Sequence, residues 1–396
     1  PAEILVHKKE YSNTMMIKNV LKKIVVFCLY TFFKAFRVRK NIALFSDFYG
    51  KRFTNDVEET LKYLLRKNFS KVKFVIVYND LILNELPQNV RVVRRFSVSH
   101  IYSAAIAGVR VNSCHESTVL KKRKGVLNVQ LWHGTPLKKI GLQVQGKNYR
   151  NMRKLTLADS ATWDLLVAPN DYVKSLYCNA FGIEEGLVVV DQVPRDRVIL
   201  NKSAFTPFII TSKSISNFAQ IKKDKKLCLY APTFRDDDKL DSKIKFSLRA
   251  YHEKYNEHFI LGVRLHSNVI SSLSTDDKKY LVDFSKFNDL PLLLRNTDLL
   301  ITDYSSLMFD FQLLGLPIIR YAHDFRHYTD KLRELNFDYD KMPGSVAYTE
   351  KELFEQLDFI IRTPNYRNVP GNDYSAHSGE FYNRLDQLLS QHNFGV

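Results

Sequence analysis

The sequence contains few cysteines and none of the common nucleotide-binding motifs. Its four cysteines are scattered over 396 residues, without the CxxC or Cys/His spacing of a zinc site. We therefore expect reduced thiols in a cytosolic protein rather than disulfides. Neither GxxxxGK(S/T) nor GxGxxG occurs, which argues against a P-loop NTPase and against a dinucleotide-dependent dehydrogenase.

The sequence also lacks an apolar run near its start that could span a membrane. The uncharged run at residues 24–33 is ten residues long, whereas a spanning helix needs about 20. No small-residue cleavage site follows it, so a signal peptide is poorly supported. Residues 1–40 contain nine Lys or Arg against two Glu. This mixture predicts a basic amphipathic helix lying on an anionic membrane surface, and the alternative is a helix packed on the protein's own body.

Acidic residues are in deficit, because 42 Asp and Glu stand against 59 Lys and Arg and leave a formal net charge of +17. Such a charge fits nucleic acid, an anionic membrane or a polyanionic substrate as partner, so a non-enzymatic polyanion binder is one function class to weigh. A carboxylate cluster for a metal is not expected. The three aspartates at residues 236–238 are consecutive on an expected turn, where neighbouring side chains point apart.

Strand-like and helix-like segments alternate after residue 40. Apolar runs that suit buried strands occur at residues 42–45, 126–132, 259–265 and 299–302, separated by segments of helical spacing. This alternation predicts an α/β chain with mostly parallel sheets, whose ligands bind beyond the carboxyl ends of the strands. An aperiodic Ser/Thr/Lys-rich stretch marks a linker. We place an N-terminal domain at residues 41–205 and a C-terminal domain at 206–396.

The stretch at residues 298–317 combines a strand, a hydroxyl-rich turn and the start of a helix. Backbone N–H groups at such a helix start attract anions, and Ser305 and Ser306 add two hydroxyl donors suited to phosphate. Asp310, one turn into the helix, is placed to accept from a ribose hydroxyl. An ordinary capped helix is the alternative interpretation.

Basic residues stand at the ends of several predicted strands. His133 follows the strand at 126–132, beside a glycine, a Thr-Pro pair and two lysines, and histidine is suited to moving protons near neutral pH. His266 ends the strand that carries Arg264. Arg195 follows the last strand of the first domain and is either a phosphate ligand or part of a surface ion pair with a nearby aspartate, Asp191 or Asp196. A structural role is the alternative for a lone strand-end histidine.

Five motifs resemble the CDP-glycerol glycerophosphotransferase family of teichoic acid and capsule synthesis. They occur in order over about residues 41–350: QLWHGTPLKKIG (130–141), VPRD (193–196), LYAPTFRDD (229–237), RLH (264–266) and LLITDYSSLMFDFQLLGLPII (299–319). The resemblance implies a GT-B-like fold, in which two Rossmann-like domains face each other across a cleft. It also implies a CDP-glycerol-dependent phosphotransferase that moves glycerol phosphate to a hydroxyl of a lipid-linked acceptor and releases CMP.

The resemblance assigns roles to individual residues. His133 would be the general base on the acceptor hydroxyl, and His266 would contact the diphosphate and assist the departure of CMP. Arginines would lie by the phosphates, and Pro232 and Thr233 would flank the cytidine. No metal or other cofactor is expected. The implied CDP-glycerol-binding residues are Trp132, Gly134, Thr135, Pro136, Arg195, Pro232, Thr233, Arg264, Ser305, Ser306 and Asp310.

Within the family, the short length favours the primase, which adds the first glycerol phosphate to undecaprenyl-diphosphate-linked ManNAc-GlcNAc. A poly(glycerol phosphate) or poly(ribitol phosphate) polymerase for teichoic acid or capsule, or a nucleotide-sugar glycosyltransferase on the same fold, is the alternative. The implied partners are CDP-glycerol, the undecaprenyl-diphosphate-linked acceptor and an anionic membrane surface, but no nucleic acid. We expect a peripheral protein at the cytoplasmic face of the bacterial cell membrane. The neutral residues 142–145 and the segment 323–328 depart from the family pattern, which leaves the acceptor and the polyol open.

Overall fold

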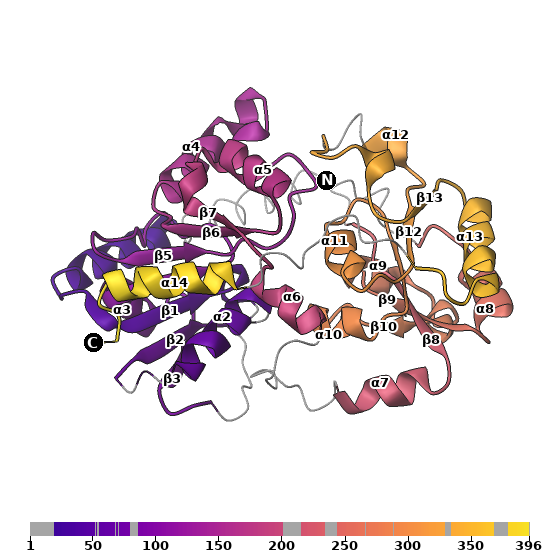
Figure 1. The fold of residues 1–396 in the computed structure, drawn as a ribbon, viewed down its shortest axis with the longest axis horizontal. Helices are drawn as coiled ribbons and strands as arrows, with labels where there is room; N and C mark the ends of the chain where they lie inside the picture. Colours follow the sequence, from indigo (N-terminus) through magenta and orange to yellow (C-terminus); the bar gives the residue numbers. More distant parts are fainter. Residues whose placement is uncertain are drawn as a thin grey trace, which may run out of the picture.

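The computed structural model describes residues 20–395, except for 52, 54, 68, 70, 80–85, 201–214, 234–243, 266, 288, 329–333 and 368–378. Within these residues the chain forms two parallel β-sheets, each accompanied by helices, which lie beside each other in Figure 1. This is the expected α/β organisation with two sheet domains. The domain boundary expected at residues 205 and 206 lies outside the described residues.

The first sheet has the strand order β3-β2-β1-β4-β5-β6-β7, and its neighbouring strands are parallel. The order reverses between β1 and β4, which is where ligands of such sheets bind. The strands are β1 (Arg39–Ser46), β2 (Lys73–Val77), β3 (Val90–Val93), β4 (Ala107–Asn112), β5 (Leu127–Gln130), β6 (Leu165–Ala168) and β7 (Val188–Val190). Besides the helix at residues 20–33, the helices of this half of the chain are α2 (Asn55–Arg66), α3 (Val98–Ile106), α4 (Arg150–Ser160), α5 (Asp171–Phe181) and α6 (Pro194–Ile199).

The second sheet has the order β10-β9-β8-β11-β12-β13 and is also parallel. Its order reverses between β8 and β11, and β11 coincides with the strand expected at residues 299–302. The strands are β8 (Lys226–Tyr230), β9 (Phe259–Val263), β10 (Val282–Asp283), β11 (Leu299–Thr302), β12 (Ile318–Tyr321) and β13 (Ser345–Ala347). The helices are α7 (Ile215–Lys222), α8 (Leu248–Tyr255), α9 (Ser267–Ser272), α10 (Leu290–Arg295), α11 (Leu307–Gln312), α12 (Phe325–His327), α13 (Glu350–Arg362) and α14 (Glu380–Gln391).

The last helix, α14, returns to the first domain, where it appears in yellow across that half of Figure 1. Phe381 and Leu385 are fully buried in the core that β1, β2, β4 and α2 share. The Asp191 carboxylate, just after β7, accepts from the backbone N–H groups of Gly379 and Phe381 at 3.1 and 2.9 Å. The first domain is therefore completed by a helix that follows the second domain in the chain.

The two domains also contact each other beside the pocket described below. Residues 334–337 of the second domain pair with the loop at residues 134–143, and an antiparallel bridge joins the two segments. The side-chain amide of Asn336 donates to two backbone carbonyls of this loop at 2.8 and 3.0 Å. Leu137 is 2% exposed and packs in the core of the second domain, whereas Phe337 packs against a cluster of the first. These contacts fix the loop relative to both domains.

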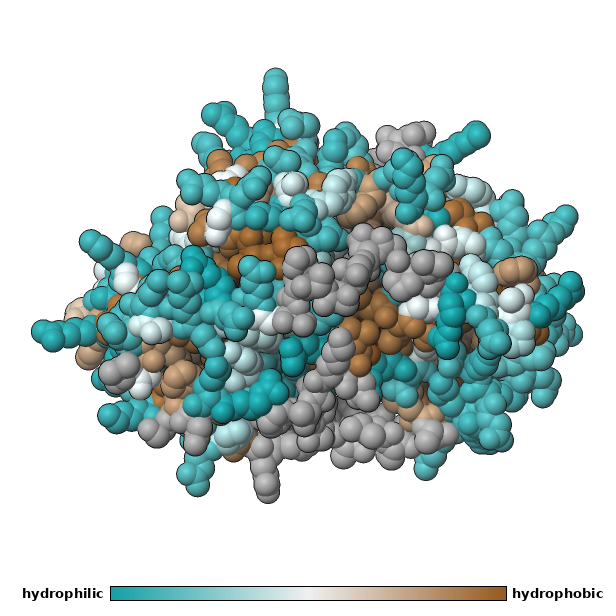
Figure 2. All heavy atoms as spheres, viewed as in Figure 1, coloured by the Kyte–Doolittle hydropathy of each residue, from teal (hydrophilic) through white to brown (hydrophobic). Residues whose placement is uncertain are grey.

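Residues 20–33 are helical, and one side of this helix packs on the first domain. Val26 and Tyr30 are buried against α3, β1 and β4, while Val25 and Phe32 are 56% and 64% exposed. No helix among the described residues is long and apolar enough to cross a bilayer. Hydrophilic residues cover most of the face shown in Figure 2, with smaller apolar areas between them. The helix therefore has both a packed side and an exposed apolar side.

Candidate active site

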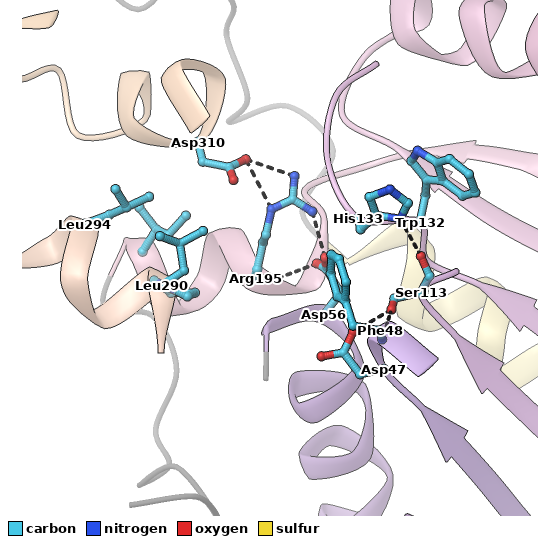
Figure 3. Close-up of a pocket in the computed structure, with 12 residues that line it drawn as sticks. Asp47, Phe48, Asp56, Ser113, Trp132, His133, Arg195, Leu290, Leu294 and Asp310 are labelled. Carbon is cyan, nitrogen blue, oxygen red and sulfur yellow. Dashed lines mark hydrogen bonds and ion pairs between the residues drawn. The ribbon is translucent and has the colours of Figure 1, made fainter. Parts of the chain in front are cut away.

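A pocket between the two domains is lined by residues from both (Figure 3). Its empty volume is about 470 Å³. The ends of β1 and β4 and the segment after β5 form one wall, α10 and α11 form the other, and α6 lies between them. The pocket thus sits at the point where the strand order of the first sheet reverses. Of the expected site residues, Trp132, His133, Arg195 and Asp310 line it.

His133 is exposed to this pocket and is held in one orientation. Its Nδ1 lies 2.8 Å from the carbonyl oxygen of Ser113. Because a carbonyl only accepts, Nδ1 must carry the proton, which leaves the lone pair on Nε2. The ring stacks on Trp132 with the ring centroids 4.3 Å apart, and the backbone N–H of Trp132 donates to the side-chain oxygen of Gln130 at 2.9 Å. The contact with Ser113 thus fixes the ring orientation and directs Nε2 away from this carbonyl.

Asp47 and Ser113 support this arrangement, although the sequence did not single them out. The Ser113 hydroxyl donates to the buried Asp47 carboxylate at 2.5 Å and accepts from the Phe48 N–H at 3.2 Å. These bonds fix the Ser113 backbone, whose carbonyl orients His133. The only sequence signal for this role is a polar pair at the end of a strand, which is common at strand ends of any function.

Arg195 ties the two walls of the pocket together. Its Nη1 donates to Asp56 of the first domain at 2.7 Å, and its Nη2 and Nε donate to Asp310 of the second at 2.9 and 3.1 Å. Burial alone would lower the pKa of Arg195, but Asp310 and Asp56 raise it, so the guanidinium stays charged. From the sequence, Arg195 is expected to be either a phosphate ligand or part of a surface ion pair with a neighbouring aspartate. The ion pairs found are buried and reach distant parts of the chain.

The turn after β11 meets the loop of His133. Gly134 has φ +138°, and a Cβ at this position would lie 3.1 Å from the Ser306 hydroxyl. Glycine suits this position, because any other residue would be strained at this φ and would crowd Ser306. The backbone N–H of Leu307 donates to the Ser305 hydroxyl at 3.3 Å. Gly134 of the first domain and Ser306 of the second thus approach each other directly.

A second buried carboxylate, Asp303, joins the turns after β8 and β11. It accepts from the backbone N–H of Thr233 at 2.8 Å and of Tyr304 at 2.5 Å. This fixes Pro232 and Thr233 beside the turn that carries Ser305. From the sequence, Asp303 is predicted only as a turn residue, because its bond to Thr233, 70 positions away, depends on two strands being neighbours in the sheet.

The remaining expected residues lie around this core of the site. Thr135 and Pro136 are buried in the loop that follows His133, and Tyr177 donates to the Gly134 carbonyl at 3.2 Å. Arg264 donates from Nη1 to the carbonyls of Phe284 and Phe287 at 3.2 and 2.6 Å. His266 lies outside the described residues. The structure therefore gathers most of the expected set at one interface.

The geometry brings the histidine-bearing loop of the first domain against the hydroxyl-bearing turn of the second. The first domain supplies the imidazole of His133, and the second supplies the Ser306 hydroxyl close to Gly134 of the same loop. Such a site suits deprotonation of an alcohol and its attack on a phosphate, where positioning and charge neutralisation matter more than covalent catalysis.

Comparisons with known proteins support this chemistry. A sequence profile of the family described as "CDP-Glycerol:Poly(glycerophosphate) glycerophosphotransferase" matches residues 28–370. The chain is 31% identical to a teichoic acid glycerol-phosphate transferase of Staphylococcus aureus, over 88% of this chain and 92% of the relative. It is 30% identical to a teichoic acid poly(glycerol phosphate) polymerase of Bacillus spizizenii, over 83% and 85%. A teichoic acid glycerol-phosphate primase of Bacillus subtilis is 29% identical, over 69% and 71%.

The fold itself matches a solved structure. The wall teichoic acid polymerase TagF superposes with a TM-score of 0.78 at 22% identity, over 97% of both chains. This likeness confirms the expected GT-B-like α/β fold with two parallel-sheet domains.

Proposed function

Because this chain belongs to the CDP-glycerol:poly(glycerophosphate) glycerophosphotransferase family, we propose that it transfers one glycerol phosphate from CDP-glycerol to a hydroxyl of an undecaprenyl-diphosphate-linked saccharide, the primase step, and releases CMP. Membership confirms the resemblance found in the sequence motifs and makes the chain a glycerophosphotransferase of teichoic acid synthesis. The observation that carries the proposal is the His133 imidazole, with its proton fixed on Nδ1, in a pocket lined by both domains.

In the proposed reaction, His133 Nε2 takes the proton of the acceptor hydroxyl. The hydroxyl oxygen then attacks the phosphorus that bears glycerol, a new P–O bond forms, and the P–O bond to CMP breaks. A correctly placed base contributes about 10²–10⁴-fold to such a step. The glycerol phosphate is now attached to the acceptor as a phosphodiester, and CMP leaves with the electron pair of the broken bond.

The second domain is proposed to hold the donor. Ser305 and Ser306 donate to the diphosphate, Pro232 and Thr233 flank the cytosine, and Asp310 accepts from a ribose hydroxyl through the oxygen that Arg195 does not bind. His266 and Arg264 neutralise charge on the departing CMP. No metal or other cofactor has a role in this proposal, because hydroxyls, backbone N–H groups, histidine and arginine supply the neutralisation that phosphoryl transfer requires.

Incubation with CDP-glycerol and a defined lipid-linked disaccharide tests the proposal, with the products followed by mass spectrometry. We expect one added glycerol phosphate per acceptor and one CMP per transfer. CDP-ribitol in place of CDP-glycerol tests the polyol in the same assay. Release of a nucleoside diphosphate with transfer of a sugar would contradict the proposal and indicate a glycosyltransferase.

Polymerisation is the second candidate, and a particular observation favours it. The polymerase relative from Bacillus spizizenii is covered over 85% of its own length, so it is about as long as this chain. Length therefore does not separate primase from polymerase, contrary to the expectation from the sequence. A ladder of products with excess CDP-glycerol would identify a polymerase.

Membrane contact through residues 20–33 is proposed as the way the protein reaches a lipid-linked acceptor at the cytoplasmic face. The exposed apolar side of this helix, interleaved with lysines, supports contact with an anionic surface. The double substitution Val25→Asp and Phe32→Asp is expected to weaken binding to phosphatidylglycerol vesicles at least about ten-fold, because it places charge where apolar side chains enter the bilayer interface.

Co-sedimentation with vesicles measures this binding. Phe359→Asp is the matched control, because Phe359 is 54% exposed on α13 of the second domain. Equal binding by the double variant and the wild type would show that this helix does not contact the membrane.

A further inference from the structure

Arg95 carries a charge that the active site, as described so far, does not use. It follows β3, and its guanidinium carbon lies 5.0 Å from the ring centre of Tyr49 and 4.4 Å from that of Phe96. No other residue in the described part of the chain forms a hydrogen bond or ion pair with this guanidinium. Contact with two aromatic rings restrains the group and removes part of its water, while its N–H donors can still bind an anion.

The acidic group that acts most strongly on Arg95 does not neutralise it. Burial lowers the pKa of Arg95, and Glu116 opposes this effect. The Glu116 carboxylate, however, forms an ion pair with the buried Arg110 at 3.1 Å. Glu116 is therefore paired with Arg110 and does not neutralise the positive charge of Arg95.

Arg95 lines a second pocket, which lies directly behind His133. Tyr49, Cys114 and Glu116 line the same pocket, whose empty volume is about 320 Å³. The Cys114 sulfur is 3.6 Å from Nδ1 of His133. Phe48, the residue before Tyr49, lines the main pocket instead, with its ring centre 5.2 Å from that of His133. The adjacent residues Phe48 and Tyr49 thus line the two pockets, one each.

The backbone around both pockets is held in an unusual conformation. Six non-glycine residues in the described part of the chain have positive φ, and four of them are Phe48, Tyr49, Phe96 and Trp132. Two of these provide the rings that clamp Arg95, and the other two pack against His133. Such strain persists where the surrounding structure enforces it, often at ligand sites.

The helix at residues 20–33 reaches the same aromatic ring as Arg95. Lys22 of this helix lies 5.3 Å from the ring centre of Phe96, the same ring that Arg95 contacts. Positive charge therefore continues from the helix proposed to touch the membrane, past Arg95, toward His133. A lipid-linked acceptor with its lipid end at this helix would pass Arg95 before its saccharide reaches His133.

We propose that Arg95, clamped between Tyr49 and Phe96, binds a phosphate group of the acceptor and thereby places the acceptor hydroxyl at His133. This inference rests on the proposed function. Two acceptor groups have the required chemistry: the diphosphate that joins the saccharide to the lipid, and the phosphodiester of a glycerol phosphate already on the saccharide. A guanidinium binds either through charge-assisted hydrogen bonds.

Steady-state kinetics with two synthetic acceptors test the proposal. One is a short-chain polyprenyl-diphosphate disaccharide, and the other is the same molecule with one glycerol phosphate attached. Arg95→Gln is expected to raise the acceptor KM about ten- to hundred-fold and to leave the KM for CDP-glycerol unchanged. Arg94→Gln is the matched control, because Arg94 is the exposed neighbour of Arg95 and does not line the pocket.

The two acceptors distinguish the two phosphate sources. A loss with both acceptors identifies the diphosphate, and a loss confined to the second identifies the phosphodiester. An acceptor KM within two-fold of wild type for both substrates, or an equal rise in the KM for CDP-glycerol, overturns the proposal. If Arg95→Gln lowers the midpoint of thermal unfolding, the acceptor KM of Arg95→Lys is the deciding measurement. This variant keeps the positive charge but loses the planar donor geometry of the guanidinium.

Binding of the same acceptors by calorimetry separates this inference from the proposed function. If the wild type transfers glycerol phosphate but Arg95→Gln binds acceptor equally well, only the role of Arg95 is wrong. If the wild type transfers nothing, the proposed function is wrong, and the affinity difference between wild type and Arg95→Gln still decides whether Arg95 binds these phosphates.

Discussion

Replacing His133 with alanine is expected to lower kcat for glycerol phosphate transfer about 10²–10⁴-fold, with little change in the KM for CDP-glycerol. The reason is that the two domains are proposed to act on different substrates. His133 belongs to the first domain and acts on the acceptor hydroxyl, whereas the donor is proposed to rest on the turns after β8 and β11. Removing the imidazole takes away the proton acceptor but leaves the donor-binding groups in place.

Steady-state kinetics with both substrates varied provide the measurement. His258→Ala, at an exposed position before β9, is the control and should retain wild-type rates. A substantial rate in the His133→Ala variant, or a KM for CDP-glycerol that rises in step with the loss of kcat, would show that His133 is not the base. A charge-driven polyanion binder has no use for this histidine, so the same variant separates that class from an enzyme.

Replacing Arg195 with methionine is expected to reduce the free energy of unfolding by about 3–5 kcal/mol. Asp56 and Asp310 are 4% and 13% exposed in their side chains and would lose their shared partner. Buried carboxylates without a counter-charge are costly, and here they belong to different domains. We therefore expect the loss of stability to be accompanied by weaker coupling between the domains and by lower transfer activity.

Urea unfolding followed by circular dichroism measures this change. Arg249→Met is the control, because Arg249 forms an exposed pair with Glu253 within α8, and exposed pairs contribute about 0–1 kcal/mol. Adding Asp56→Asn to Arg195→Met is expected to recover part of the loss by removing one of the two stranded charges. Equal stability of Arg195→Met and Arg249→Met would mean that the buried network does not hold the domains together.

The local parts of the site could be predicted from sequence because their signals are local. The strand at residues 299–302 was placed at its observed bounds, and His133 was expected at a strand end from the residues beside it. Both inferences need only a periodicity and a few neighbouring residues. The closeness of the His133 loop to Ser306 was an implication of the family resemblance rather than of the pattern.

The supporting contacts could not be predicted, because they join segments that are distant in the chain. Local reading offered Asp191 and Asp196 as partners of Arg195, but its partners are 139 and 115 positions away. Asp191 instead caps the start of α14. Asp47 and Ser113 are 66 positions apart and meet only because β1 and β4 are adjacent in the sheet. Strand order is a property of the whole fold, which one sequence without relatives does not reveal.

The return of α14 to the first domain has a consequence for how the protein is made. Ribosomes deliver residues in order, and domains of a nascent polypeptide commonly fold as they emerge. Here the surface that α14 covers stays open to water until residues 380–391 have been synthesised, after the whole second sheet. The first domain is therefore synthesised first but completes its core last. Until then its apolar surface remains exposed and can be bound by chaperones.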